Sequence, residues 1–146
     1  MFRGTYTTRL DEKGRLKVPA DFKRLIDENY GTQFYITSRN GTIGEVYPMQ
    51  EWEEIERKLA LAPDSHPGKK KFLKYTNFYG HVVDMDGQGR LLLPAALREK
   101  ANLKGEVAVM GSLKHLLVQN AEALRKEIAA EPFTHEDDAS LSVLGI

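Results

Sequence analysis

The sequence predicts a mainly β fold with flanking α helices, built from two similar halves of one chain. The stretch LDEKGRLKVPA near the N-terminus returns 75 residues later as MDGQGRLLLPA, with six of eleven positions identical. Around both copies, short segments alternate apolar and polar residues, as half-buried strands do. Four short strands are too few to cover a core, whereas about eight suit a small closed barrel filled by side chains. We therefore expect a pseudo-twofold β-barrel decorated by helices.

The first half is predicted to contain four strands and two helices. Asp11–Gly14 forms a turn between the first two strands, because aspartate hydrogen-bonds nearby backbone and glycine accepts a positive φ. Pro19 ends the second strand, since proline cannot donate to a β ladder. Apolar residues at helical spacing follow Pro19 and again follow Pro48. The expected strands are 5–10, 15–18, 33–37 and 43–47, and the expected helices are 21–28 and the segment that begins at Pro48.

The second half repeats this order around the turn Asp86–Gly89. We expect each turn to join its two flanking strands as a hairpin. Asn120 is a suitable N-cap for a last helix, and Ala62–Gly68 (APDSHPG) is a break between the halves. The expected strands are 81–85, 90–93, 106–110 and 114–118, with a helix at 95–101. The chain then divides into 5–50 (first repeat), 51–79 (helix and linker), 80–122 (second repeat) and 123–146 (C-terminal helix and acidic tail).

The composition is that of an ordinary globular protein. There is no cysteine, no apolar run long enough for a membrane span and no apolar core of a secretory signal, so we expect a cytoplasmic protein. The four histidines are scattered without ligand spacing, and no phosphate-binding loop or nucleophile motif occurs. We expect no metal, no cofactor and no catalytic residues, and an enzyme has little support.

Charge follows the repeat, although the net charge is zero with 21 basic and 21 acidic residues. Residues 1–24 and 66–100 each carry seven Lys or Arg against three Asp or Glu. Residues 25–65 and 119–146 are acidic in excess. A neutral chain is unusual for a nucleic-acid-binding protein, but the local basic excess lies at both motifs.

The repeated turn has two interpretations. In the structural one, each arginine pairs with the aspartate of its own turn. In the functional one, a tip that carries Lys13 and Arg15 enters a DNA groove as a β-ribbon, and arginine reads guanine O6 and N7. Recurrence of the arginine as Arg90 favours function, because duplication of a barrel does not by itself require an exposed arginine. The residues alone leave both interpretations open.

A second basic stretch, KKKFLKYTNFYG, mixes lysines with aromatic residues, as surfaces that bind single strands do. The simpler interpretation is a short linker helix. Phe72, Tyr75 and Phe78 or Tyr79 would pack it on the barrel and leave the lysines in solvent.

Three stretches, MFRGTYTTRLDEKGRLKVPADF, YPMQEWEEIE and DGQGRLLLPAALR, resemble the bacterial MraZ family over nearly the whole chain. The resemblance implies a double-psi β-barrel-like fold of two pseudo-symmetric AbrB-like halves. It also implies a DNA-binding transcriptional regulator, usually a repressor, of the division and cell-wall gene cluster. Such a regulator would bind direct repeats in its own promoter region, form a ring-shaped homo-oligomer and associate with the nucleoid.

Carried onto this chain, the family's DNA-contacting motif falls on Asp11–Arg15 and Asp86–Arg90. Arg15 and Arg90 would be the main contacts with double-stranded DNA, while Asp11 and Asp86 brace the loops. The wider set of DNA-binding candidates adds Lys13, Gly14, Lys17 and Gly89. The second loop has Gln88 and Leu92 in place of the two lysines, so the loops should contribute unequally. The alternative is a ring-forming protein-interaction module without a DNA role.

Overall fold

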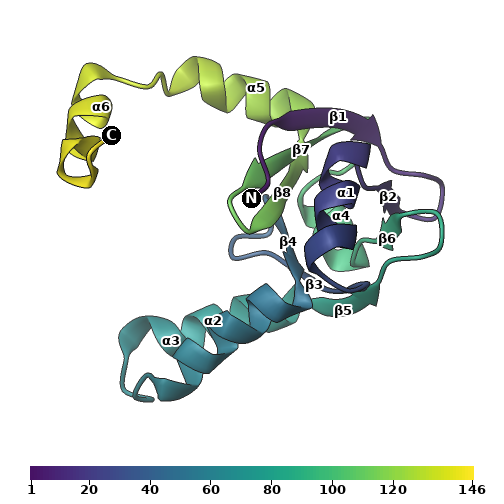
Figure 1. Ribbon diagram of the computed structural model, residues 1–146, viewed down its shortest axis with the longest axis horizontal. Helices are drawn as coiled ribbons and strands as arrows, with labels where there is room; N and C mark the ends of the chain where they lie inside the picture. The colour runs from purple at the N-terminus through teal and green to yellow at the C-terminus, as the bar shows by residue number, and fades with distance from the viewer.

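A computed structural model describes all 146 residues, and its strands form two antiparallel sheets. The larger sheet has six strands in the order β1-β7-β8-β4-β3-β5, and the smaller pairs β2 with β6 (Figure 1). The strands are β1 Thr5–Arg9, β2 Arg15–Lys17, β3 Gln33–Thr37, β4 Gly44–Pro48, β5 His81–Asp84, β6 Arg90–Leu92, β7 Glu106–Ser112 and β8 His115–Asn120. The helices are α1 Ala20–Asn29, α2 Met49–Leu61, α3 Pro67–Phe78, α4 Ala95–Lys100, α5 Ala121–Ala130, α6 His135–Ser140 and the 3-10 turn η1 Leu141–Leu144.

The strand order is the same when the two halves are exchanged. β1 pairs with β7 and its equivalent β5 pairs with β3, while β3–β4 and β7–β8 are equivalent antiparallel pairs. At the centre, β4 pairs with its own equivalent β8. The prediction of two halves with matching elements is therefore confirmed at the level of topology. The six-stranded sheet ends at β1 and β5, which do not pair with each other.

The short strands β2 and β6 correct one expectation. Neither forms a hairpin with the strand that precedes it; instead they pair with each other across the halves. Leu16 lies opposite Leu91, the residue 75 positions later, so the pseudo-twofold axis passes through this pair. The reason is burial: both leucines have no exposed surface, and pairing β2 with β6 places both side chains in the shared core.

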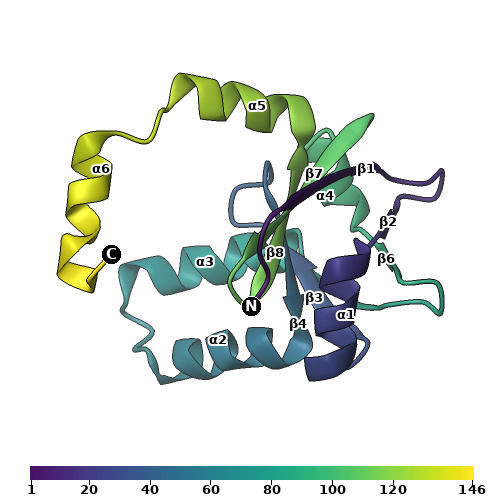
Figure 2. The same ribbon diagram turned by 45° about the horizontal axis from the view of Figure 1, so that its top comes forward.

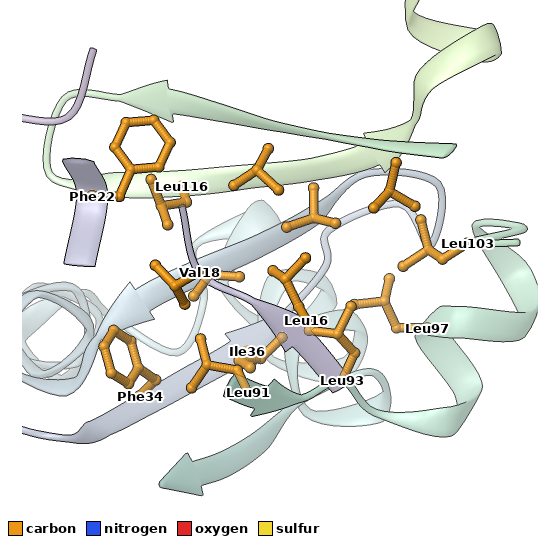
Figure 3. Close-up of a cluster of buried hydrophobic side chains, with 14 of the residues drawn as sticks. Leu16, Val18, Phe22, Phe34, Ile36, Leu91, Leu93, Leu97, Leu103 and Leu116 are labelled. Carbon is orange, nitrogen blue, oxygen red and sulfur yellow. The ribbon is translucent and has the colours of Figure 1, made fainter. Parts of the chain in front are cut away.

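One core unites the halves. It contains 19 buried apolar residues, and Figure 3 shows side chains from both halves meeting between the strands. Phe22 of α1 and Leu97 of α4 occupy equivalent places and are almost fully buried. Both halves supply residues to this one cluster, so neither half contains the whole core. The labelled residues in Figure 3 are Leu16, Val18, Phe22, Phe34, Ile36, Leu91, Leu93, Leu97, Leu103 and Leu116.

Two helical extensions leave the core on the side away from the β1–β2 and β5–β6 loops (Figures 1 and 2). α2 and α3 form an antiparallel helical hairpin, held to the sheet by Trp52, which stacks on Tyr35 at 4.6 Å and on Phe72 at 6.2 Å between ring centroids. The predicted packing holds for Phe72 and, of the alternatives Phe78 or Tyr79, for Tyr79, but it is wrong for Tyr75. Tyr75 is 39% exposed and Phe78 is 68% exposed.

The predicted boundaries differ from the structure mainly at the helices. Pro48 is the N-cap of α2 rather than its first residue, and α3 begins at Pro67, inside the predicted break. Proline suits a first helical turn, where its missing N–H has no partner to lose. Asn120 caps α5 as predicted, by accepting a hydrogen bond from Ala123 N. No helix is both long and apolar enough to cross a membrane.

Candidate functional site

The two repeated loops have nearly identical hydrogen bonding. In the first, Asp11 Oδ1 accepts from the backbone N–H of Lys13 at 3.0 Å and of Arg15 at 2.9 Å, and Oδ2 accepts from Arg15 Nε at 2.6 Å. In the second, Asp86 accepts from the equivalent atoms at 2.9, 3.0 and 2.8 Å. Each aspartate therefore fixes its loop and the arginine at the end of it.

Each loop is also held by the opposite half. Val18 N donates to Gly89 O at 3.0 Å, and Leu93 N donates to Gly14 O at 3.1 Å, an equivalent pair of bonds. Arg90 Nη1 lies 3.9 Å from Asp11 Oδ2, so the second arginine also faces the first aspartate. The structure thus brings the two distant motifs into one continuous site, shown at the right of Figures 1 and 2.

The outer face of the β2–β6 ribbon carries three cations. Side chains alternate along a strand, so the burial of Leu16 and Leu91 turns Arg15, Lys17 and Arg90 outward. Lys17 lies directly opposite Arg90 in the register, a pairing of like charges that opposes strand association. Asp86, which accepts a hydrogen bond from Arg90 Nε at 2.8 Å, offsets part of this repulsion.

The predicted site residues differ in exposure. The side chains of Arg15 and Arg90 are 28% and 27% exposed, because each is held against its aspartate through Nε. No protein group accepts a hydrogen bond from their terminal nitrogens. Lys13 is exposed at the loop tip without an acidic partner, and Lys17 Nζ donates to Gln88 O of the other loop. The terminal guanidinium edges and the lysines are therefore the groups that can bind a ligand.

Two further basic residues belong to this site, although we did not predict them from the sequence. Gly14 and Gly89 are buried, Gly14 beneath the guanidinium of Arg98 and Gly89 beneath the aliphatic stem of Lys23. Arg98 comes from α4 in the second half and Lys23 from α1 in the first, so each helix covers the loop of the other half. The two residues are 75 positions apart and both basic, a signal that comparison of the repeats beyond the motif would have revealed.

The predicted positive φ of both loop glycines is confirmed, at +83° for Gly14 and +75° for Gly89. We expect Gly89→Ala to lower the free energy of unfolding by about 1–2 kcal/mol, because an L side chain is strained in this region. A new Cβ would also lie 2.9 Å from Lys23 Cδ. Gly87→Ala is the matched control from the same loop, since its Cβ meets nothing within 4 Å. Urea unfolding of both variants checks this, and equal losses would contradict it.

Hydrogen bonding lowers the pKa of both loop aspartates below the ordinary 3.8. For Asp11 the largest cause of the lowered pKa is the hydrogen bond from the Arg15 backbone N–H. For Asp86 the largest single effect is partial desolvation, which raises the pKa, but the hydrogen bonds from Arg90 and Gln88 together outweigh it and lower the pKa. A lowered pKa in the folded state means that the carboxylates stabilise the fold above pH 3.8 and lose this effect as pH falls through the lowered values.

We therefore expect a double Asp11→Asn, Asp86→Asn variant to lose less stability between pH 5 and 2 than the parent, because it lacks these two carboxylates. Urea unfolding across this pH range measures the difference. Asp84→Asn, at an exposed aspartate whose side chain forms no hydrogen bond, is the control and should follow the parent curve. The account of the loops is wrong if the double variant follows it as well.

The arrangement provides a surface lined by basic side chains. No group of three His, Cys, Asp or Glu side chains could hold a metal ion. Guanidinium groups with free terminal nitrogens, flanked by lysines on a two-stranded ribbon, match the phosphates and base edges of nucleic acid.

Comparison with known proteins agrees with the repeat. A family model described as "MraZ protein, putative antitoxin-like" matches residues 1–74 and 80–143. The chain is 54% identical over 146 residues to "Transcriptional regulator MraZ" of Acidobacterium capsulatum, and 57% identical over 147 residues to the protein of the same name from Koribacter versatilis, with full coverage of both chains in each case. It is 33% identical over 139 residues to the Shewanella woodyi protein of that name, covering 94% of this chain and 91% of the other. Two equivalent Asp–Arg loops, joined in one core and matched by this model over both halves, show that the chain belongs to the MraZ family.

Proposed function

We propose that this chain regulates transcription by holding double-stranded DNA against the two Asp–Arg loops and the β2–β6 ribbon between them. As a member of the MraZ family it is a DNA-binding regulator of the division and cell-wall gene cluster, and it is not an enzyme. The finer parts of the proposal are the repressor role, the direct repeats in its own promoter region, a cytoplasmic, nucleoid-associated location and a double-psi β-barrel as the common frame of both halves.

The observation that carries the proposal is the pairing of β2 with β6. This pairing places Arg15, Lys17 and Arg90 on one outward face, although they are distant in sequence. A two-stranded β-ribbon fits the major groove of B-form DNA, and an arginine can donate two hydrogen bonds to guanine O6 and N7. Arg15 and Arg90 can do so with their terminal nitrogens while Nε remains bonded to aspartate.

The other residues have supporting roles in this proposal. Asp11 and Asp86 brace the loops, and Gly14 and Gly89 shape them from buried positions. Lys13 contacts phosphate from the exposed tip of the first loop. The second loop has Gln88 at the equivalent place, so the first loop contributes more electrostatic attraction.

A mobility-shift titration with the chain's own upstream DNA tests this function. Binding should weaken steeply as salt rises, because each lysine or arginine on phosphate releases counterions. Scrambled DNA of the same length and composition is the control and should bind more weakly. Equal affinity for both probes would contradict a sequence-specific regulator.

Self-association is part of the proposal because one copy offers a small contact surface. Several copies in a ring would present many loops, and direct repeats about one helical turn apart would engage neighbouring copies. Linked sites raise the effective local concentration without any new contact.

We expect a homo-oligomer larger than a dimer that binds a probe with two or more repeats at least tenfold more tightly per site than a one-repeat probe. Analytical ultracentrifugation measures the assembly, and fluorescence anisotropy with both probes measures the coupling. The control is a two-repeat probe whose spacing is altered by half a helical turn. A monomer with equal affinity per site for all probes would refute this mechanism.

A further inference from the structure

The last sixteen residues form an extension whose side chains are almost all exposed in one copy of the chain. We call residues 131–146, which include α6 and η1, the C-terminal arm. Every residue of the arm except Leu141 is exposed, and the arm lies clear of the core (Figures 1 and 2) and of the α2–α3 hairpin (Figure 1). Isolated helices as short as α6 are marginal in water. An arm folded in this way is therefore expected to pack on a surface elsewhere.

The arm combines apolar and acidic side chains. Its exposed apolar residues are 68–87% exposed, more than a soluble monomer usually leaves in one segment. It has four acidic residues and no lysine or arginine, and only Asp137 is used internally, in the capping box of α6. The apolar set is Phe133, Val143, Leu144 and Ile146, and the acidic set is Glu131, Glu136, Asp137 and Asp138.

The surface of the α2–α3 hairpin has the opposite character. A hollow of about 430 Å³ lies between the two helices, and a second of about 500 Å³ continues from it past Phe72 to Tyr75. We call these two hollows the hairpin groove. Its apolar lining is Ile55, Leu59, Ala62, Phe72 and Tyr75, and its basic lining is Arg39, Lys58, Lys69 and Lys71.

Two of the three lysines that line this groove lack an acidic partner within the chain. Lys58 and Lys71 are exposed and form no ion pair, whereas Lys69 pairs with Asp64. An apolar, basic groove and an apolar, acidic arm on the same chain are complementary in both respects. Neither is covered in a single copy.

We propose that the C-terminal arm of one copy docks in the hairpin groove of a second copy. The contact is head-to-tail, since it leaves the groove of the first copy and the arm of the second free, and such contacts close into rings or extend into filaments. The DNA-binding loops lie on the other side of the core from both the arm and the hairpin, so assembly leaves them open (Figures 1 and 2). The inference rests on the self-association in the proposed function and identifies its contact.

Disulfide cross-linking tests the contact directly, because the chain contains no cysteine. Lys58→Cys in the groove and Val143→Cys in the arm are mixed as two purified single-cysteine variants and oxidised. We expect a mixed disulfide dimer on a non-reducing gel. Leu113→Cys, at a leucine that is 67% exposed but outside the groove, replaces Lys58→Cys in the control and should give none. Absence of the Lys58–Val143 dimer, or an equal yield in the control, would overturn the proposal.

Cysteines at the same two positions also show whether the arm docks on a second copy or on the hairpin of its own chain. A single chain that carries both cysteines should form cross-links between chains. If it closes on itself at high dilution and the two-variant mixture gives no dimer, the arm belongs to its own hairpin and the proposal is wrong.

Charge reversal gives an independent readout. Glu136→Lys with Asp138→Lys should weaken assembly about tenfold or more in ultracentrifugation, since like charges would face each other. Adding Lys58→Glu and Lys71→Glu in the same chain should restore it. No loss on the first change, or no recovery on the second, would overturn the contact.

DNA binding separates this inference from the proposed function. The arm variants should keep the affinity of the parent for a one-repeat probe, while Arg15→Ala with Arg90→Ala should lose DNA affinity and still form the cross-link. If the cross-link forms but no variant or parent binds DNA specifically, the contact stands and the DNA-binding function fails.

Discussion

Replacing both Arg15 and Arg90 with alanine is expected to lower affinity for the upstream direct repeats by about 100-fold or more. A lost bidentate contact to a base typically costs about 1–3 kcal/mol, and two are removed together. Each single substitution should act in the same direction, with Arg15→Ala the larger because its loop also carries Lys13 and Lys17. Fluorescence anisotropy at fixed salt measures these affinities.

The arginines also stabilise the loops, so controls must separate contact from folding. Arg15→Lys keeps the positive charge but lacks the guanidinium group. In the parent, Nε of this group bonds Asp11 while its two terminal nitrogens stay free. It should retain phosphate attraction and lose sequence preference. Arg57→Ala removes an exposed arginine on α2 that pairs with Glu54, far from the loops, and should leave DNA affinity unchanged. Unchanged affinity in the Arg15, Arg90 double variant would contradict the proposed role.

The largest effect on stability is expected for the leucine pair at the pseudo-twofold axis. Leu16→Ala or Leu91→Ala should each lower the free energy of unfolding by about 2–5 kcal/mol, because each side chain is fully buried and truncation leaves a cavity. The two losses should not be additive, since the residues face each other across β2–β6 and share the space that is emptied. Urea unfolding of both single variants and the double variant measures the coupling.

Leu92→Ala is the matched control. Leu92 neighbours Leu91 on the same strand, but its side chain points outward and the residue is 50% exposed. Its truncation should cost well under half as much. Equal losses at positions 91 and 92 would mean that β6 does not present one face to the shared core.

Much of the fold could be predicted because the sequence contains two copies of the same local signals. Gly14 and Gly89 mark turns, and the prolines at 19 and 94 precede helices in both halves. Strand β3 has its predicted bounds, and the bounds of every other strand lie within two residues of the prediction. Local propensity and alternation act over short segments, so a single sequence reveals them.

The pairing of strands could not be predicted in the same way. Alternation in β2 and β6 is equally compatible with a hairpin to the preceding strand, and only burial of Leu16 and Leu91 in a common core decides between them. Because β2 and β6 pair across the halves, Lys23 and Arg98 each cover the loop of the other half. These two positions could therefore not be predicted either. The division into segments 5–50, 51–79, 80–122 and 123–146 stays a prediction.

Hydrogen exchange with and without repeat DNA tests most directly whether both loops form one DNA-binding surface. Backbone amides of residues 11–17 and 86–92 should exchange more slowly when DNA is bound, in both loops and in the β2–β6 ribbon between them. Amides of the outward face of α3 should be unaffected at constant assembly state. Protection of the α2–α3 hairpin or the C-terminal arm by DNA, with the two loops unchanged, would contradict the account.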